Sequence, residues 1–203
     1  MKIVPAVLCG ALLALPNFAR ASVIDFEDLN FDHATDFPSV PDGYRGFSWN
    51  GVRVLDPAAY AGGVYFAVLG GGIVSGTNVA TNPPLGMTIS SGSPFDFVGA
   101  YLTSGEIFDV VIEVLGSKEG IPLYSQSYLL PVGPAGYYSF GFAGVDSLFF
   151  SAGFGGGAIL GRFAMDDFTF VKPVPEPETY ALVLAGLGIL ASVTRRKNKA
   201  LTA

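Results

Sequence analysis

The sequence predicts an all-β protein, an antiparallel β-sandwich of jelly-roll type. Gly and aromatic residues are abundant, with 27 Gly, 17 Phe and 9 Tyr in 203 residues, whereas charged residues make up only 14%. Short apolar segments alternate with Gly, Pro, Asn and Asp, and no segment in the middle of the chain keeps a 3.6-residue period. Many short strands joined by tight turns are typical of sandwiches and jelly rolls. A signal helix and a transmembrane helix are expected to flank this fold.

Residues 1–21 have the composition of a secretory signal peptide. Lys2 supplies the positive start, residues 3–15 are apolar, and residues 19–21 read Ala-Arg-Ala, a small-x-small cleavage pattern. We expect signal peptidase to cut before Ser22, although a buried N-terminal helix is the alternative. Cys9 is the one cysteine of the sequence and lies inside this peptide. The mature chain therefore has no cysteine for disulfides, thiolate metal sites or nucleophilic catalysis.

Residues 22–172 are expected to form the sandwich. Ten segments have the length and apolar content of strands, and turn clusters such as Pro41-Asp42-Gly43 separate them. The clearest alternation is that of Val110, Ile112 and Val114, which is typical of a half-buried strand. The predicted strands are Val23–Glu27, Phe47–Leu55, Val64–Leu69, Met87–Ser90, Phe95–Thr103, Ile107–Leu115, Leu123–Leu130, Tyr137–Phe142, Ser147–Ala152 and Ala164–Val171.

The predicted sandwich is strongly acidic. Residues 22–172 contain 15 acidic and 5 basic residues, which gives a net charge of −10. Nucleic acid is therefore not an expected partner, because its phosphates require Lys and Arg. The charge is compatible with binding of divalent cations, or simply with solubility.

The C-terminal segment combines prolines, a short apolar stretch and a basic tail. Residues 180–193 carry no charge, but as a helix they reach only about 21 Å, whereas a membrane span normally needs about 20 residues. Prolines fix φ and remove a backbone donor, so the segment before the stretch is expected to be extended. The flanking residues are Val174, Pro175, Glu176, Pro177 and Glu178 on one side and Arg195, Arg196 and Lys197 on the other.

This order of features closely resembles the PEP-CTERM sorting signal of Gram-negative bacteria. The resemblance implies a signal over residues 173–203, with the motif at 174–178, a transmembrane segment at 179–194 and a basic tail at 195–203. It implies that an exosortase-type membrane protease recognises and cleaves this segment. It further implies a precursor that is transiently in the inner membrane, followed by sorting to the cell surface or extracellular matrix, often in bacteria that make exopolysaccharide and form biofilms. An ordinary tail anchor is the alternative.

The two ends of the predicted sandwich carry acidic residues on apolar strands. They resemble the jelly-roll ectodomains of other PEP-CTERM proteins and carbohydrate-binding modules of galactose-binding-like type, some of which hold a structural calcium. The resemblance makes Glu27, Asp28, Asp166 and Asp167 candidate calcium ligands, with the oxygen atoms that this cation prefers. Adjacent residues of a strand point to opposite faces, so Asp166 and Asp167 reach one ion only at a bulge or a chain end. The alternative is that they cap the surface and bind a loop.

The sequence favours a non-enzymatic surface or matrix protein associated with exopolysaccharide. A carbohydrate-binding module is the alternative, with Trp49 and Tyr44 stacking on sugar rings, although core packing is the preferred interpretation of Trp49. A glycoside hydrolase that uses two carboxylates is less favoured. His33 is the only histidine and is expected to be solvated, so His-based catalysis is not expected.

Overall fold

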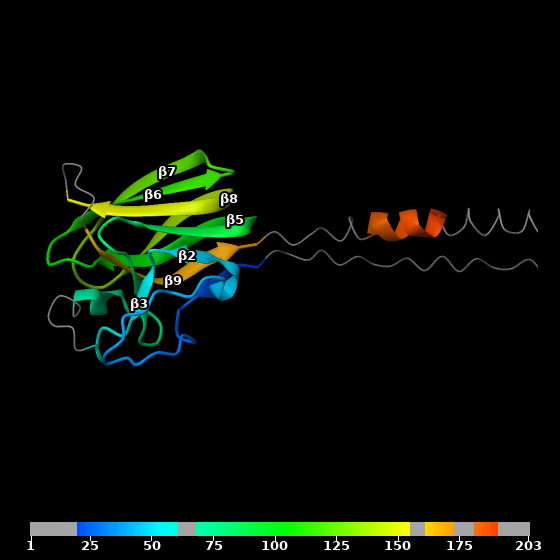
Figure 1. The fold of residues 1–203 in the computed structure, drawn as a ribbon. Helices are drawn as coiled ribbons and strands as arrows, with labels where there is room; N and C mark the ends of the chain where they lie inside the picture. Colours follow the sequence, from blue (N-terminus) through cyan, green and yellow to red (C-terminus); the bar gives the residue numbers. More distant parts are fainter. Residues whose placement is uncertain (1–19, 61–67, 155–160, 173–180, 191–203) are drawn as a thin grey trace, which may run out of the picture. The chain divides into compact units, whose positions relative to one another are not determined.

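The computed structural model describes residues 20–60, 68–154, 161–172 and 181–190 (Figure 1). The chain divides into two units, of which one is Arg20–Pro173 and the other combines Met1–Ala19 with Val174–Ala203. Almost all of the predicted signal peptide, residues 1–19, lies outside the described residues.

The unit Arg20–Pro173 is a mostly antiparallel β structure, which confirms the predicted fold class. Every strand pair in it is antiparallel. The strands are β1 (Ser22–Ile24), β2 (Ser48–Asn50), β3 (Arg53–Leu55), β4 (Val79–Thr81), β5 (Met87–Ser104), β6 (Val110–Lys118), β7 (Ile121–Leu130), β8 (Gly136–Gly153) and β9 (Phe163–Val171), and two short 3-10 helices are η1 (Tyr44–Gly46) and η2 (Val68–Gly72).

Two long strands, β5 and β8, contribute to both layers of the sandwich. In the first layer, residues 87–90 of β5 pair with β2 and with β8, and the order continues through β6 to β7. In the second layer, residues 95–102 of β5 pair with residues 136–145 of β8, and β9 pairs with the other side of β5. The far edge of β9 pairs with β1 and β4, and β4 pairs with β3. Register shifts between Ser90 and Phe95 mark the place where β5 passes from one layer to the other.

The core between the layers is aromatic. Phe97 of β5 is fully buried, and its ring centroid lies 4.9 Å from that of Phe140, 5.8 Å from that of Phe150 and 4.9 Å from that of Phe168. The buried cluster that contains these rings is drawn from residues 24–170. Because this core lies within one unit, we expect the unit to fold by itself.

The predicted strands differ from the observed ones in how they are divided. Met87–Ser90 and Phe95–Thr103 are one strand, β5, and Tyr137–Phe142 and Ser147–Ala152 are likewise one strand, β8. Phe47–Leu55 is instead two strands, because Gly51 has a φ of +75 and turns the chain between them.

Other segments begin, end or fold differently from the prediction. Val68 and Leu69, predicted as the end of a strand, lie in η2, and residues 64–67 lie outside the described residues. The strand β4 was not predicted. In β6 the predicted alternation is confirmed, since Val110, Ile112 and Val114 are all fully buried.

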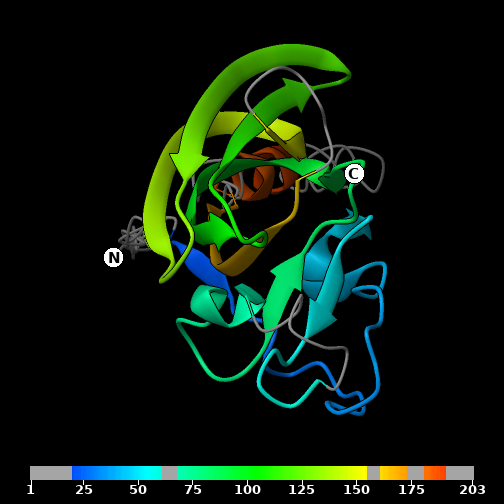
Figure 2. The same cartoon turned by 90° about the vertical axis from the view of Figure 1, so that its left-hand side faces the viewer.

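Side-chain hydrogen bonds connect β7 of the first layer with residues 138–143 of β8 in the second layer. We call the residues Tyr124, Gln126 and Tyr128 of β7, together with Tyr138 of β8, the tyrosine seam. Figure 2 shows how these strands curve, with β7 and β8 in yellow-green and yellow. The seam donates hydrogen bonds from Tyr128 Oη to Ser139 O (2.8 Å), from Gln126 Nε2 to Phe140 O (3.2 Å), from Tyr124 Oη to Ala143 O (3.2 Å) and from Tyr138 Oη to Leu129 O (3.3 Å). These carbonyls thereby gain side-chain donors.

Candidate functional site

Trp49 lies in the core and does not form a surface platform. Its side chain is 4% exposed, and its ring centroid lies 5.5 Å from that of Phe26 and 5.8 Å from that of Phe168. Its indole Nε1 donates a hydrogen bond of 2.9 Å to the carbonyl of Tyr44. Core packing, the preferred interpretation of Trp49, is therefore confirmed. The alternative, that Trp49 stacks on a sugar ring, is wrong, because its ring is surrounded by other aromatic rings. Its observed role is to hold the loop before β2.

Tyr44 is half-buried and is engaged at its hydroxyl group. The hydroxyl donates to Asp28, and Arg45 Nη2 lies 2.6 Å from the other oxygen of the same carboxylate. Burial raises the pKa of Tyr44, and the hydrogen bond to Asp28 raises it further. The Tyr44 ring also stacks on Phe26, at 6.2 Å between centroids. A role of Tyr44 in ligand binding stays a prediction.

Three of the four candidate calcium ligands contact one loop, residues 74–78. Glu27 accepts hydrogen bonds from the backbone N–H groups of Thr77 (3.0 Å) and Asn78 (2.7 Å). Asp166, which is fully buried, accepts bonds of 2.8 Å each from the N–H groups of Val74 and Ser75. We call Glu27, Asp166 and Asp167 with this loop the acidic clamp.

Asp166 and Asp167 are brought to the same side by a bulge in β9. The register with β5 shifts between Gly99 and Tyr101, and Asp167 has a φ of +50. Ser75 Oγ consequently lies 2.9 Å from an Asp167 oxygen and 3.3 Å from an Asp166 oxygen. Burial raises the pKa of Asp166, although hydrogen bonds from backbone amides oppose this shift.

The arrangement accounts for these carboxylates without a cation. Asp28 contacts Arg45 and Tyr44, and the described residues include no group of three or more His, Cys, Asp or Glu side chains that could hold a metal ion. The residue Asn78, whose N–H binds Glu27, has a buried side-chain oxygen, Oδ1, that accepts no hydrogen bond from the described residues. Calcium binding therefore stays a prediction, and its four proposed ligands do not form one cluster.

Other ionisable residues with possible catalytic roles are engaged in structural contacts. His33 Nδ1 lies 3.2 Å from Asp56 Oδ2, and its ring stacks on Phe31 at 4.5 Å between centroids. Glu106 is 5% exposed and accepts hydrogen bonds from the backbone and side chain of Arg162. The expectation that His33 is a solvated residue is thus correct only in part.

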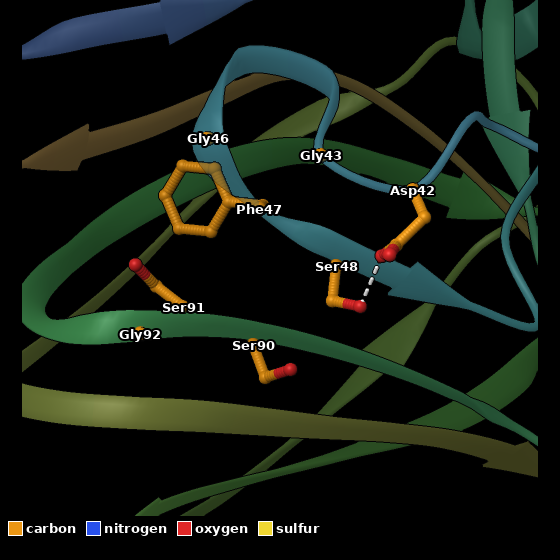
Figure 3. Close-up of a pocket in the computed structure, with 8 residues that line it drawn as sticks. All are labelled: Asp42, Gly43, Gly46, Phe47, Ser48, Ser90, Ser91 and Gly92. Carbon is orange, nitrogen blue, oxygen red and sulfur yellow. Dashed lines mark hydrogen bonds between the residues drawn. The ribbon is translucent and has the colours of Figure 1, made fainter.

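A shallow pocket beside the Tyr44 loop was missed at the level of sequence. It has a volume of about 330 Å³ and lies between residues 42–48 and residues 90–92 of β5 (Figure 3). Its walls are formed by Ser and Gly residues together with Asp42 and Phe47. Such residues read as ordinary turn signals, so the sequence offered no indication of the pocket.

The C-terminal unit is described only over residues 181–190, which form an α-helix with exposed side chains. Among the described residues, no helix is long and apolar enough to cross a membrane. The transmembrane segment predicted at residues 179–194 is therefore not confirmed. The motif at 174–178 and the basic residues from 195 onward lie outside the described residues.

Comparison with known proteins identifies the C-terminal segment. Residues 173–197 match the family model of the PEP-CTERM protein-sorting motif, which confirms the resemblance predicted from the sequence. No curated protein matches the chain.

Two solved structures share a distant likeness with the chain. TmCBM61, in complex with β-1,4-galactotriose, is 12% identical over 65% of this chain and 95% of its own, with a TM-score of 0.36. The enzymatically active domain of tailspike protein 4 of bacteriophage CBA120 is 9% identical over 64% of this chain, with a TM-score of 0.34. The matched region spans only 20% of that tailspike chain. Neither similarity supports an argument about binding or activity.

Proposed function

We propose that this chain, which carries a PEP-CTERM sorting motif, is an exported protein that an exosortase-type protease processes for display at the cell surface or in the extracellular matrix. The observation that carries the proposal is the motif match over residues 173–197. The sequence order supports it, because prolines keep the segment before the apolar stretch extended and basic residues follow the stretch. Signal peptidase would remove residues 1–21 first, and cleavage by the second protease would fall near residues 175–179.

The displayed domain acts without catalysis in this proposal, in association with exopolysaccharide of a Gram-negative biofilm. Glycoside hydrolysis needs two carboxylates within about 10 Å across a cleft, and the pocket in Figure 3 is lined by one, that of Asp42. Glu106 is paired with Arg162, and Glu113 is bonded to Ser125. These contacts support a structural or binding role for the domain.

Sorting can be tested with two epitope tags in the native host. One tag follows Ala203, and the other is inserted at Gly120, where the turn between β6 and β7 is exposed. We expect the surface or matrix protein to keep the internal tag and to lack the C-terminal tag. In a strain without the protease, both tags should remain on one membrane-associated chain.

Substitution of the motif separates sorting from folding. The double change Pro175→Ala with Pro177→Ala should leave the C-terminal tag uncleaved, since the segment is no longer held extended. Pro122→Ala, in the exposed part of β7, is the matched control and should be processed normally. A mature surface protein that still carries residues beyond Thr194 would overturn the proposal.

A further inference from the structure

The pocket of Figure 3 is built on a loop that several contacts hold in place. Trp49 Nε1 binds the carbonyl of Tyr44, and Lys172 Nζ lies 3.2 Å from the carbonyl of Gly46 and 4.5 Å from the centroid of the Phe47 ring. Phe47 is 1% exposed and packs against Phe95 and Phe170, at 5.0 Å and 4.8 Å between centroids. The loop is therefore arranged before any ligand arrives, which lowers the entropic cost of binding.

The polar groups of the pocket are those that bind hydroxyl groups. Asp42 accepts a hydrogen bond from Ser48 at one oxygen, and its other oxygen accepts none from the described residues. Ser91 Oγ accepts only from the backbone of Ser93, at 3.4 Å, and Ser90 Oγ has no hydrogen-bond partner in the described part of the chain. A free carboxylate oxygen accepts from a hydroxyl, and a serine hydroxyl both donates and accepts. The set thus matches a ligand with several neighbouring hydroxyl groups.

The charge of the pocket selects against acidic ligands. Asp42 is its only ionisable lining residue, and the predicted mature domain has a net charge of −10. A carboxylate ligand would be repelled by Asp42, whereas the two cations beside the pocket are not lining residues and are engaged elsewhere, Arg45 with Asp28 and Lys172 with the carbonyl of Gly46. Aromatic stacking is also unavailable, since the Phe47 ring is covered. Recognition must therefore depend on hydrogen bonds to a neutral molecule.

We propose that this pocket binds a neutral sugar unit of a polysaccharide, with Asp42, Ser90 and Ser91 as the hydrogen-bonding residues. The volume of about 330 Å³ lies at the lower end of small-molecule pockets, which range over about 300–1,000 Å³. It therefore suits a small part of a chain and not a long segment. The inference rests on the proposed function, because it names the ligand class of the surface domain.

The structure offers a substitution that fills the pocket without disturbing the fold. A Cβ added at Gly92 meets nothing within 4 Å, and Gly92 is not among the glycines with positive φ. Gly92→Leu therefore places a side chain in open space at the pocket wall. Gly136→Leu is the matched control, since Gly136 is also exposed, also lacks a positive φ and has its nearest contact at an ordinary 3.5 Å. Asp42→Ala removes the carboxylate, which is exposed and bonded only to Ser48.

Binding can be measured on residues 20–173, which contain the whole core, by NMR titration of backbone amides. The probes are cellotriose, mannotriose and isomaltotriose, with trigalacturonate as the acidic counterpart. We expect at least one neutral trisaccharide to bind with a Kd of about 1 mM or below and to shift the signals of residues 42–48 and 90–92. Trigalacturonate should cause no such shifts.

The variants decide whether the pocket is responsible. Gly92→Leu and Asp42→Ala should each weaken binding at least about tenfold at unchanged Tm, whereas Gly136→Leu should bind as the unsubstituted domain does. Undiminished binding in Gly92→Leu, or no shift at residues 42–48 and 90–92 with any neutral probe, would overturn the proposal. Because sorting is scored separately by the tag experiment, failure of sugar binding is distinguishable from failure of the proposed function.

Discussion

The tyrosine seam and the acidic clamp both bind backbone groups with side chains, and they do so with opposite chemistry. In the seam, neutral hydroxyl and amide groups donate to carbonyls of the edge strands. In the clamp, carboxylates accept from N–H groups of the loop 74–78. The seam residues are half-buried, whereas Asp166 is fully buried. The comparison teaches that the donor or acceptor character of an edge side chain follows the backbone group that it binds, and that burial sets the cost of removing it.

The largest effect is expected from Asp166→Ala. The substitution removes a fully buried carboxylate and with it the acceptor of the Val74 and Ser75 N–H groups, which should lower the free energy of unfolding by about 3 kcal/mol. Asp146→Ala is the control, because Asp146 accepts one exposed backbone bond, from Glu119. Urea unfolding followed by circular dichroism measures both. Equal losses in the two variants would contradict the expectation that removing the buried Asp166 carboxylate costs more stability than removing an exposed one.

A smaller loss is expected in the seam from Tyr128→Phe. The Tyr128 hydroxyl donates to Ser139 O at 2.8 Å, but the groups involved remain close to water, so we expect a loss of about 1 kcal/mol. Tyr137→Phe is the matched control, since the Tyr137 hydroxyl makes no hydrogen bond among the described residues and the side chain is 44% exposed. A loss in Tyr137→Phe as large as that in Tyr128→Phe would show that the loss of a hydroxyl group as such, and not of this hydrogen bond, is being measured.

The pH dependence of stability should differ between the two edges. Burial raises the pKa of Asp166 above its ordinary value of 3.8, so the folded state holds this proton more tightly than the unfolded state. The resulting contribution to stability is complete below pH 3.8 and is lost as the pH rises through the raised pKa. The free energy of unfolding of the unsubstituted domain, relative to Asp166→Asn, should therefore fall as the pH rises from about 4.

The matched measurement for the pH series is Tyr128→Phe. Its difference from the unsubstituted domain should stay constant over the same range, because this substitution leaves Asp166 and its hydrogen bonds in place. A relative stability of Asp166→Asn that is independent of pH would contradict the raised pKa of Asp166.

The smallest effect is expected from calcium. Since the carboxylates of the clamp already accept backbone hydrogen bonds, we expect EDTA to change the Tm by less than about 2 °C, which is no more than the shift that about 1 kcal/mol produces in a domain of this size. Differential scanning calorimetry with and without millimolar calcium measures this. A larger loss that calcium restores, and that Glu27→Gln or Asp167→Asn abolishes, would instead support the calcium site predicted from the sequence.

The sandwich was predictable because alternation and turn residues are local signals. Val110, Ile112 and Val114 show the inward face of β6 directly. The continuity of β5 was not predictable, because Gly92 and Pro94 read as a turn whereas the strand bends there and continues into the other layer. Whether such residues end a strand or bend it depends on partners that lie far away in the sequence.

Of the candidate sites, only the one formed by a contiguous stretch of the sequence could be predicted. The sorting motif could be identified because its residues are contiguous, and residues 173–197 match the family. For Trp49 the sequence favoured the core but left the surface open, because an aromatic residue on a strand faces either the core or solvent. The partners that cover it, Phe26 and Phe168, are distant in the sequence. The bulge needed to bring Asp166 and Asp167 together is present. The groups that bind Asp166, however, are backbone amides of the loop 74–78, and this loop has no charged residue that would have marked it as a partner.

The position of β9 has a mechanical consequence. Val171 is its last residue, so a tether that continues toward the C-terminus pulls on this strand. β9 is bonded to β5 along one edge and to β1 and β4 along the other, with Ser22 directly opposite Phe170. Because these bonds run perpendicular to the strand, a load along it is shared among many of them in shear and does not open them one by one. The strand that would receive a pull on the chain beyond Val171 is thus held on both sides, so the folded domain resists unravelling from that end.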